Sequence, residues 1–270
     1  MLTPIVQRWQ NRRASYRPAG EPIQTRLYEV AEILRDGPAR DYVLRQHYSG
    51  SYPAARRRFG LYRGVDLVGV AVFSVGVNEG ALRGLPGEGE ERIELGRFVL
   101  DDDVPANGET WFQARCFEQL RRDGLVSVLS NADPMPRRTA AGELVFPGHV
   151  GTIYQASNAV YLGRGTSRTL HLLPDGSVLS ARALQKLRSG ETGWRYAAQQ
   201  LQRHGAEDLQ PGEDRRSWLR QWLPRVCTTQ RHPGNHRYAW ALQRGDRRHL
   251  PQSQPYPKFA VSQLQLPGVP

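Results

Sequence analysis

Apolar residues follow the spacing of β-strands along several stretches of the chain. Positions 26–33 alternate in polarity, and 59–63 and 67–75 form a hairpin pattern around Gly64. The second hairpin segment is almost wholly apolar, as is the stretch 93–100, which is typical of strands buried on both faces. The pattern therefore predicts a sheet with a buried centre.

A helical pattern between two apolar stretches predicts the topology of this sheet. Asn107 can cap a helix that runs to Asp123, where Gly124 ends it. One apolar face of this helix consists of Phe112, Cys116, Phe117 and Leu120. A short buried strand, 125–130, follows. Strand, helix and strand in this order favour parallel or mixed pairing of the two strands.

The other predicted elements complete an α+β chain. Helices are expected at 38–48, 151–158, 181–204 and 214–223, and strands at 159–163, 168–173 and 236–242, with 168–173 as hairpin partner of 159–163. The expected organisation is a basic N-terminal arm that orders only on contact (1–24), a core (25–180), a basic helical insertion (181–230), a returning strand of the core (231–250) and an extended tail (251–270).

The charge distribution indicates a polyanionic partner. The 270 residues carry a net charge of +11, and 35 of the 37 basic residues are arginine. Positions 1–60 carry a net +6 and 181–270 a net +9, whereas 61–110 carry a net −6. A composition biased by a GC-rich genome would explain the choice of arginine but not the excess of cations. Nucleic acid is therefore expected to lie against the basic flanks.

Cysteine content and hydropathy limit the compartment and the class of protein. Two cysteines, Cys116 and Cys227, exclude a disulfide scaffold and a cysteine-based zinc module, and they favour a reducing cytoplasm. No apolar run approaches the ~18 residues that span a bilayer. The first twenty residues are polar and arginine-rich, unlike a secretory signal. We therefore expect a cytoplasmic protein with no membrane partner.

Candidate chemistry begins where the first predicted helix ends. His47 could be a base or a metal ligand and Tyr48 could stack on a nucleobase; alternatively, His47 only completes the helix C-terminus, where a cation suits the dipole. The run Arg56, Arg57 and Arg58 suits bidentate phosphate contacts or, equally, a solvated surface.

Arg97 lies alone in the apolar stretch 93–100. A buried arginine is costly unless it meets an acid, a set of carbonyls or a ligand. Glu94 is three residues away, which puts it on the opposite face of a regular strand. A functional role is therefore favoured for Arg97.

A second polar cluster follows the strand at 125–130. Ser130 and Asp133 lie where sheets of this kind place ligands, although an aspartate before proline is also common in turns. Asp133 could act as the base or orient His47. His47, Asp133 and His149 are candidate metal ligands, for iron or another divalent metal, but their spacing is not a local metal motif.

Basic residues near the late strand indicate a phosphate-facing surface. Arg231, His236 and Arg237 lie within seven positions of one another, and we expect them to bind DNA together with Arg56, Arg57 and Arg58.

The order of the predicted elements resembles that of N-acetyltransferase-like (GNAT) domains, with a mixed twisted sheet flanked by helices and, here, a basic helical extension. The segment GTIYQASNAVYLGR resembles the end of such domains. In them a tyrosine that matches Tyr154 is a proton source near the donor thiol; the alternative for Tyr154 is ordinary helix packing. A fold alone does not assign a reaction.

Three further stretches resemble the Mom family of bacteriophage DNA-modification proteins. They are HYSGSYPAARRRFGLYRGVDLVGVAVFSV, ELGRFVL with NGETWF, and HVGTIYQASNAVYLGRG with the later HPGNHRYAW. The resemblance implies methylcarbamoylation of adenine in DNA, which protects phage DNA from host restriction. It also favours a catalytic role for His47 and places an acid, Asp133, in the site. The full set of candidate catalytic residues is His47, Tyr48, Arg97, Ser130, Asp133 and Tyr154.

The resemblance leaves the donor open between an acyl-CoA and an activated glycine such as glycyl-tRNA. Acetyltransferase-like domains that hold coenzyme A have a Q/R-x-x-G-x-G/A loop before the long helix, whereas this chain has DDDVPANGET. Because acids disfavour a pyrophosphate, tRNA is the better-matched second partner beside double-stranded DNA. A homodimer is one open oligomeric state. Two other functions stay open: a conventional acetyltransferase acting on a small-molecule or protein amine, and a non-enzymatic DNA-binding protein.

Overall fold

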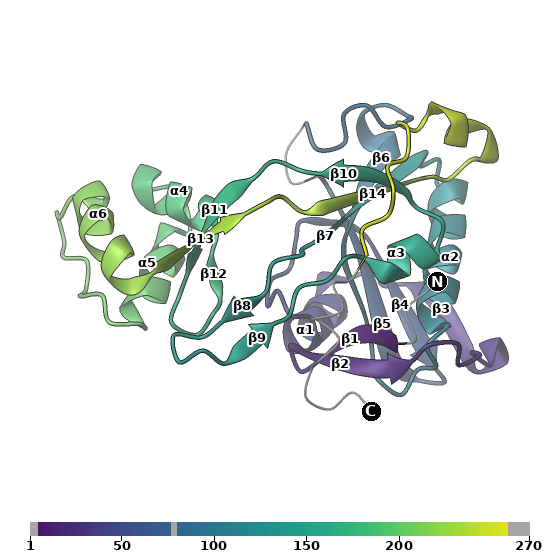
Figure 1. Ribbon diagram of the computed structural model, residues 1–270, viewed down its shortest axis with the longest axis horizontal. Helices are drawn as coiled ribbons and strands as arrows, with labels where there is room; N and C mark the ends of the chain where they lie inside the picture. Colours follow the sequence, from purple (N-terminus) through teal and green to yellow (C-terminus); the bar gives the residue numbers. More distant parts are fainter. Residues whose placement is uncertain (1–4, 77–79, 259–270) are drawn as a thin grey trace. The chain divides into compact units, whose positions relative to one another are not determined.

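The computed structural model describes residues 5–76 and 80–258 (Figure 1). The chain folds into two compact units. Unit 1 comprises residues 1–134, 149–165 and 235–270, and unit 2 comprises residues 135–148 and 166–234. Among the described residues, no helix has both the length and the apolar composition needed to cross a lipid bilayer.

Unit 1 is built on a seven-stranded sheet with the strand order β10-β14-β7-β6-β5-β4-β3. The strands are β3 (Tyr28–Glu32), β4 (Ala55–Arg63), β5 (Asp66–Ser74), β6 (Arg92–Leu100), β7 (Ser127–Ala132), β10 (Val160–Arg164) and β14 (His236–Ala241). All neighbours are antiparallel except β6 and β7, which are parallel. The parallel pair confirms the topology expected from the strand–helix–strand pattern.

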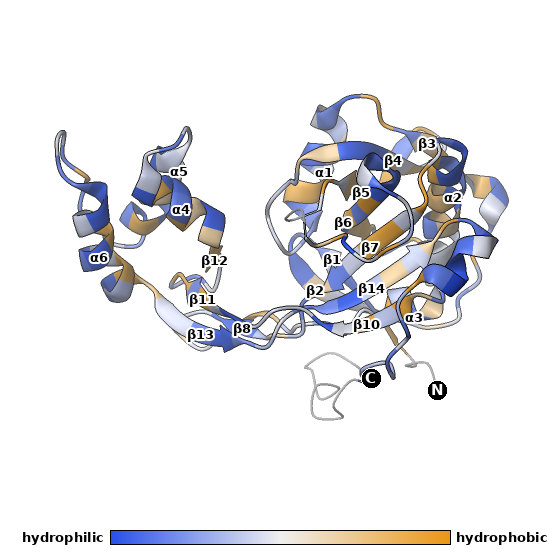
Figure 2. Ribbon diagram, turned by 90° about the horizontal axis from the view of Figure 1, so that it is seen from above, coloured by the Kyte–Doolittle hydropathy of each residue, from blue (hydrophilic) through white to orange (hydrophobic). Residues whose placement is uncertain are grey.

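Helices cover both faces of this sheet (Figure 2). α1 (Asp36–Gln46) lies on one face and α2 (Gly108–Arg122) on the other, while the short α3 (Thr152–Ala156) precedes β10. Phe112, Cys116 and Leu120 of α2 are fully buried against the strands, as the apolar stripe of that helix predicts. The expected α+β fold, a mixed sheet flanked by helices, is confirmed.

The N-terminal segment differs from the arm expected to order only on contact. β1 (Ile5–Gln10) and β2 (Arg13–Pro18) form an antiparallel hairpin. Trp9 and Arg8 of β1 are buried, at 7% and 3% exposure. The segment is ordered because these two large side chains are buried, which its polar, arginine-rich composition does not indicate.

Unit 2 contains three helices and two small sheets. Its elements are β8 (Arg137–Arg138), β9 (Leu144–Phe146), β11 (Arg168–Leu172), β12 (Val178–Leu179), α4 (Ala181–Ser189), α5 (Trp194–Gln202), α6 (Arg215–Val226) and β13 (Thr228–His232). The strands pair as β8-β9 and as β12-β11-β13. Trp218, Leu187 and Leu201 are at the centre of the helical core. Gly190, at φ +73°, ends α4 and splits the helical stretch expected at 181–204.

Two expectations about this region need correction. β11, at 168–172, pairs with β12 and β13 rather than forming a hairpin with β10, whose partner in the sheet is β14. The compact unit is also larger than an insertion at 181–230, because the proline-rich excursion 135–148 and β11 belong to it.

In unit 1, residues 251–258 of the expected tail contain no helix or strand, and Gln254 N–H donates to the Tyr161 carbonyl. The rest of that tail, from 259, lies outside the described residues.

Candidate active site

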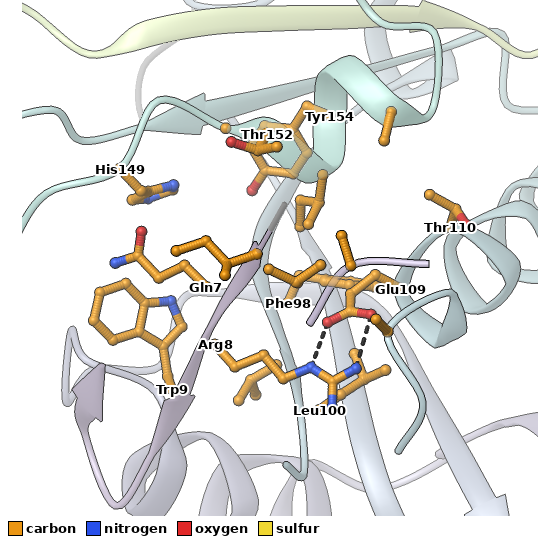
Figure 3. Close-up of a pocket in the computed structure, with 18 of the residues that line it drawn as sticks. Gln7, Arg8, Trp9, Phe98, Leu100, Glu109, Thr110, His149, Thr152 and Tyr154 are labelled. Atoms are coloured by element: carbon orange, nitrogen blue, oxygen red, sulfur yellow. Dashed lines mark hydrogen bonds and ion pairs between the residues drawn. The ribbon is translucent and has the colours of Figure 1, made fainter. Parts of the chain in front are cut away.

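A pocket opens in unit 1 where β6 and β7 separate. The ladder between the two strands ends at the pair Leu95 and Ser130, although β6 continues to Leu100. Beyond that pair lies a cavity of about 230 Å³. Its walls come from β1, the end of α1, β6, the start of α2, the end of β7 and α3 (Figure 3). The end of a strand next to a crossover helix is a common position for ligands in α/β sheets.

A bulge in β6 changes the expected relation between Arg97 and Glu94. Val72 of β5 pairs with Arg97, and the next residue, Phe73, pairs with Leu95, so Gly96 is an extra residue in the ladder. The extra residue reverses the alternation and puts Glu94 and Arg97 on the same face. The expectation of opposite faces is therefore wrong. The core confirms the shift, because Ile93 and Leu95 before the bulge share a face with Phe98 and Leu100 after it.

Arg97 fixes the segment that follows α1. Its Nε donates to the Ser51 carbonyl at 2.9 Å and its Nη2 donates to Ser51 Oγ at 2.7 Å. Gly96 lets β6 lie close to Ser74 and Pro53, because a Cβ at this position would lie 2.8 Å from Ser74 Oγ and 3.4 Å from Pro53. Arg97 thus holds in place the segment that carries His47 and Tyr48.

His47 follows the last turn of α1 and is buried, at 6% exposure. Burial holds the pKa of its imidazole well below the usual value, and the charge of Arg97 acts in the same direction. Nδ1 accepts a hydrogen bond from the Ser49 amide at 3.2 Å. A neutral imidazole with an acceptor at Nδ1 carries its proton on Nε2. In this tautomer His47 can donate a hydrogen bond from Nε2, and its role as a base stays a prediction.

Aromatic rings form one wall of the pocket. The ring centroid of Tyr48 lies 4.3 Å from that of His47, 4.5 Å from that of Trp9 and 5.9 Å from that of His149. Figure 3 shows Trp9 and His149 at the same end of the pocket. The sequence did not indicate Trp9 as a site residue. In IVQRWQ the apolar residues do not alternate regularly with the polar ones, so this stretch carries no clear strand signal.

Tyr154 lies across the pocket on α3. Gly151 begins this helix at φ +71°, and a Cβ there would lie 2.8 Å from both Tyr154 and Tyr238, so only glycine fits. Burial raises the pKa of the Tyr154 hydroxyl, while its hydrogen bond to Ser130 acts in the opposite direction. The Tyr154 phenol is therefore protonated at neutral pH and can donate a proton.

Asp133 lies beside the pocket rather than in its wall. Its side chain is buried at 8% exposure, and its backbone carbonyl accepts a hydrogen bond from the His149 amide at 2.8 Å. His47, Tyr48, His149 and Tyr154 line the cavity, whereas Asp133 is not among the lining residues. Within residues 5–76 and 80–258, no three His, Cys, Asp or Glu side chains gather as metal ligands. The set of His47, Asp133 and His149 therefore does not fit the iron or other divalent metal that the sequence left open.

The loop before α2, which in acetyltransferase-like domains holds a pyrophosphate, here holds the guanidinium of Arg8. The guanidinium of Arg8 donates to the carbonyl oxygens of Asp101 and Asp102 at 2.8 and 3.2 Å, and to those of Val104 and Pro105. It also forms a bidentate ion pair with Glu109 in the first turn of α2, shown by the dashed lines in Figure 3. Carbonyl oxygens and a carboxylate repel an anion. These residues do not fit the pyrophosphate of coenzyme A.

The arginine run on β4 is dispersed. Arg56 donates to the carbonyl oxygens of Glu90 and Arg92, Arg57 lies 3.4 Å from Asp123, and Arg58 pairs with Asp36 at 2.8 Å. All three guanidiniums therefore have intramolecular partners, and their role in DNA binding stays a prediction.

The other predicted DNA contacts divide by exposure. Arg231, in unit 2, is exposed and donates to Ser167 Oγ. In unit 1, Arg237 is half-buried and donates to the Ala81 carbonyl. His236 is 2% exposed, and its Nδ1 lies 2.7 Å from the Tyr161 hydroxyl. The expected phosphate-facing surface is therefore wrong for His236, because a buried imidazole cannot reach DNA.

Comparisons with known proteins find a matching family model and similar solved structures. A family model described as the Mom protein family matches residues 28–258. A Bacillus subtilis acetyltransferase, solved in complex with CoA, matches with 11% identity and a TM-score of 0.34, over 80% of this chain and 98% of that chain. A tandem GNAT protein from the clavulanic acid biosynthesis pathway, solved without acetyl-CoA, matches with 10% identity and a TM-score of 0.42, over 80% and 99%. No curated protein matches the sequence.

Proposed function

Because this chain belongs to the Mom protein family, we propose that it is a transferase that converts the N6 amine of adenine in DNA to a carbamoylmethyl group and so protects phage DNA from restriction. The observation that carries the proposal is the pocket between β6 and β7. It combines a wall of aromatic rings with a buried phenol and a buried imidazole at its mouth. This combination suits a planar base beside groups that can exchange protons.

The target adenine must leave the duplex to reach this pocket. Enzymes that act on a base swing it out of the stack and hold it between aromatic or apolar side chains. In the proposal, Tyr48 is the stacking platform, and its packing against Trp9 and His47 keeps the ring in place. Arg97 is a positioning residue, because its hydrogen bonds to Ser51 secure the segment that carries Tyr48.

The donor in this proposal is an activated glycine, such as glycyl-tRNA. N6 attacks the glycyl ester carbonyl, the ester C–O bond breaks, and the 3′-oxygen leaves with a proton. The free glycyl amine then attacks C6 through a five-membered ring, and the bond from C6 to the amide nitrogen breaks. The former N6 becomes the carboxamide nitrogen, and the product is a carbamoylmethyl group on the glycine nitrogen.

The pocket residues take these roles in the first step. Nε2–H of His47 donates a hydrogen bond to the developing oxyanion. Tyr154 gives its hydroxyl proton to the leaving oxygen, and the phenolate takes the proton from N6. The raised pKa of Tyr154 makes its phenolate a strong base for that proton. Asp133, beside His149, is the further candidate base in the proposal.

Unit 2 supplies a surface for the DNA backbone. The exposed residues Arg188, Arg216 and Arg220 form a basic face, in which Nε of Arg216 contacts the Arg188 carbonyl and Arg216 and Arg220 are one helical turn apart on α6. Exposed guanidiniums in a row suit phosphate contacts. We expect this basic face, together with Arg231, to bind duplex DNA.

Nucleoside mass spectrometry tests the reaction. Plasmid DNA from cells that express the chain should contain carbamoylmethyl-deoxyadenosine, and DNA from cells with His47→Ala or Tyr154→Ala should not, while both variants still bind DNA. His249→Ala is the matched control, because His249 is exposed and distant in sequence from the pocket residues. An acetylated base would instead indicate a conventional acetyltransferase, and unmodified DNA with tight DNA binding a non-enzymatic protein.

Isotope labelling tests the donor and the rearrangement. With glycine labelled at its nitrogen, the label should be on the nitrogen bonded to C6 of adenine. A label in the carboxamide would contradict the rearrangement, and an unlabelled product would contradict glycine as the donor.

A further inference from the structure

Asn131 places an amide in the wall of the pocket at the point where β7 leaves β6. It lies one residue beyond Ser130, the last β7 residue that pairs with β6, and it is one of the residues that line the cavity. Its backbone still pairs with Arg237 of β14, so the strand holds its position. A side chain on a paired strand is held more rigidly than one on a loop.

Glu94 sets the orientation of this amide. Nδ2 of Asn131 donates to Oε1 of Glu94 at 2.9 Å, and Glu94 is 6% exposed on β6. A carboxylate only accepts hydrogen bonds, so the NH₂ end of Asn131 must face it. The opposite orientation would place two oxygens together in a buried position, which is strongly unfavourable. The amide oxygen Oδ1 is therefore directed away from Glu94.

We propose that Oδ1 of Asn131 recognises the exocyclic amine of the flipped base, and that Glu94 is the positioning residue that fixes Oδ1 as an acceptor. The inference rests on the proposed function, since it concerns the same pocket. Adenine carries an N–H donor at position 6, whereas guanine carries an oxygen acceptor there. A fixed acceptor therefore admits adenine and rejects guanine.

The hydrogen bond also prepares the amine for reaction. Oδ1 takes one N6–H, which orients the nitrogen and leaves its second N–H to be removed. The bulge at Gly96 serves the same arrangement, because it brings Arg97 to the face of β6 that carries Glu94. The positive charge of Arg97 favours the ionised carboxylate on which the orientation of Asn131 depends.

Binding of base analogues tests the inference. Duplex oligonucleotides carry adenine, 2,6-diaminopurine, which keeps the 6-amine, or purine, which lacks it, at the target position. We expect the full chain to prefer adenine and diaminopurine over purine by about 10- to 100-fold. Asn131→Leu, which is similar in shape but has no acceptor, should bind all three equally, and Glu94→Gln should reduce the preference because a glutamine permits either orientation of the amide.

Asn107→Leu is the matched control. Asn107 lines the same pocket, next to the start of α2 and not on β7, and should keep the wild-type ratio of adenine to purine affinity. An unchanged ratio in Asn131→Leu, or no preference in the wild-type chain, would overturn the inference. If Asn131→Leu does not fold, Glu94→Gln decides in the same way. Modified adenosine without the base preference contradicts this inference alone, whereas the preference without any modified adenosine contradicts the proposed reaction.

Discussion

The two units of the molecule carry similar net charge but place it differently. Unit 1 has 24 basic and 19 acidic residues in 187 positions, and unit 2 has 13 basic and 7 acidic residues in 83. Buried charges in unit 1 include Arg8, Glu94, Glu109 and Asp133, which lie in or beside the pocket. In unit 2 the basic face of Arg188, Arg216 and Arg220 is exposed.

Buried charges in unit 1 and exposed arginines in unit 2 have different roles. A buried charge must be fully paired, so in unit 1 it fixes the position of a neighbour, as Arg8 fixes Glu109 and Glu94 fixes Asn131. An exposed arginine contributes little to stability and remains available to a partner. Changes to buried charges should therefore lower the free energy of unfolding, whereas changes to the basic face should alter only DNA binding.

The largest decrease in the free energy of unfolding is expected for Arg8→Ala. The change leaves Glu109 buried without its bidentate partner and removes one donor from four carbonyl oxygens, of which those of Asp101 and Pro105 keep a backbone donor. Breaking a buried pair in this way costs about 3–5 kcal/mol of the free energy of unfolding. Chemical denaturation of the variant measures it. Arg17→Ala is the control on the same hairpin, because the pair of Arg17 with Glu21 is partly exposed and contributes about 0–1 kcal/mol. Equal decreases in the free energy of unfolding in the two variants would contradict the expected difference between buried and partly exposed ion pairs.

Much of the fold could be predicted from hydrophobic patterning. The strands of the central sheet and helix α2 follow from apolar runs and from one apolar stripe, because local spacing determines which face is buried. The β1–β2 hairpin could not be predicted in this way. Arg8 is stable in the interior because Glu109 and the carbonyl oxygens of the loop before α2, about a hundred residues away, accept its hydrogen bonds, and no local pattern encodes contacts of that separation.

The site shows the same limit. His47, Tyr48 and Tyr154 were predicted, His47 and Tyr154 with the help of family resemblance, and they line one pocket. Glu94 was set aside because a regular strand separates it from Arg97, whereas Gly96 adds a residue and reverses the alternation. A glycine inside an apolar strand is a signal for a bulge, and the apolar phase changes there from Ile93 and Leu95 to Phe98 and Leu100. The burial of His236 depends on tertiary packing and had no such signal.

A smaller effect is expected from His236 as the pH falls. Burial, aided by the charge of Arg164, lowers the pKa of this histidine to about 4 in the folded chain, against 6.5 in the unfolded chain. Between these values the unfolded state binds a proton that the folded state does not, so the free energy of unfolding falls as the pH falls from 6.5 towards 4. One proton corresponds to a slope of about 1.4 kcal/mol per pH unit.

His236→Phe should reduce that slope by up to one proton, although His47, whose pKa is also lowered, keeps part of it. Denaturation curves at a series of pH values between 4 and 7 measure the slope. A change at an exposed residue that does not titrate, Gln243→Phe, should leave the slope as it is in the wild-type chain. A slope that is unchanged in His236→Phe would show that this imidazole is protonated in the folded state.

The smallest effect on stability, and the sharpest test of the comparison, is expected in unit 2. Arg216→Gln and Arg220→Gln together should change the free energy of unfolding by less than about 0.5 kcal/mol, because both side chains are exposed. Each lost phosphate contact should lower the salt dependence of DNA binding by about one unit in the slope of log K against log salt. Titrations at several salt concentrations give that slope. Since Arg182 is also exposed but pairs with Glu191, Arg182→Gln should leave the slope unchanged; an equal decrease would mean that net charge, and not the basic face, determines binding.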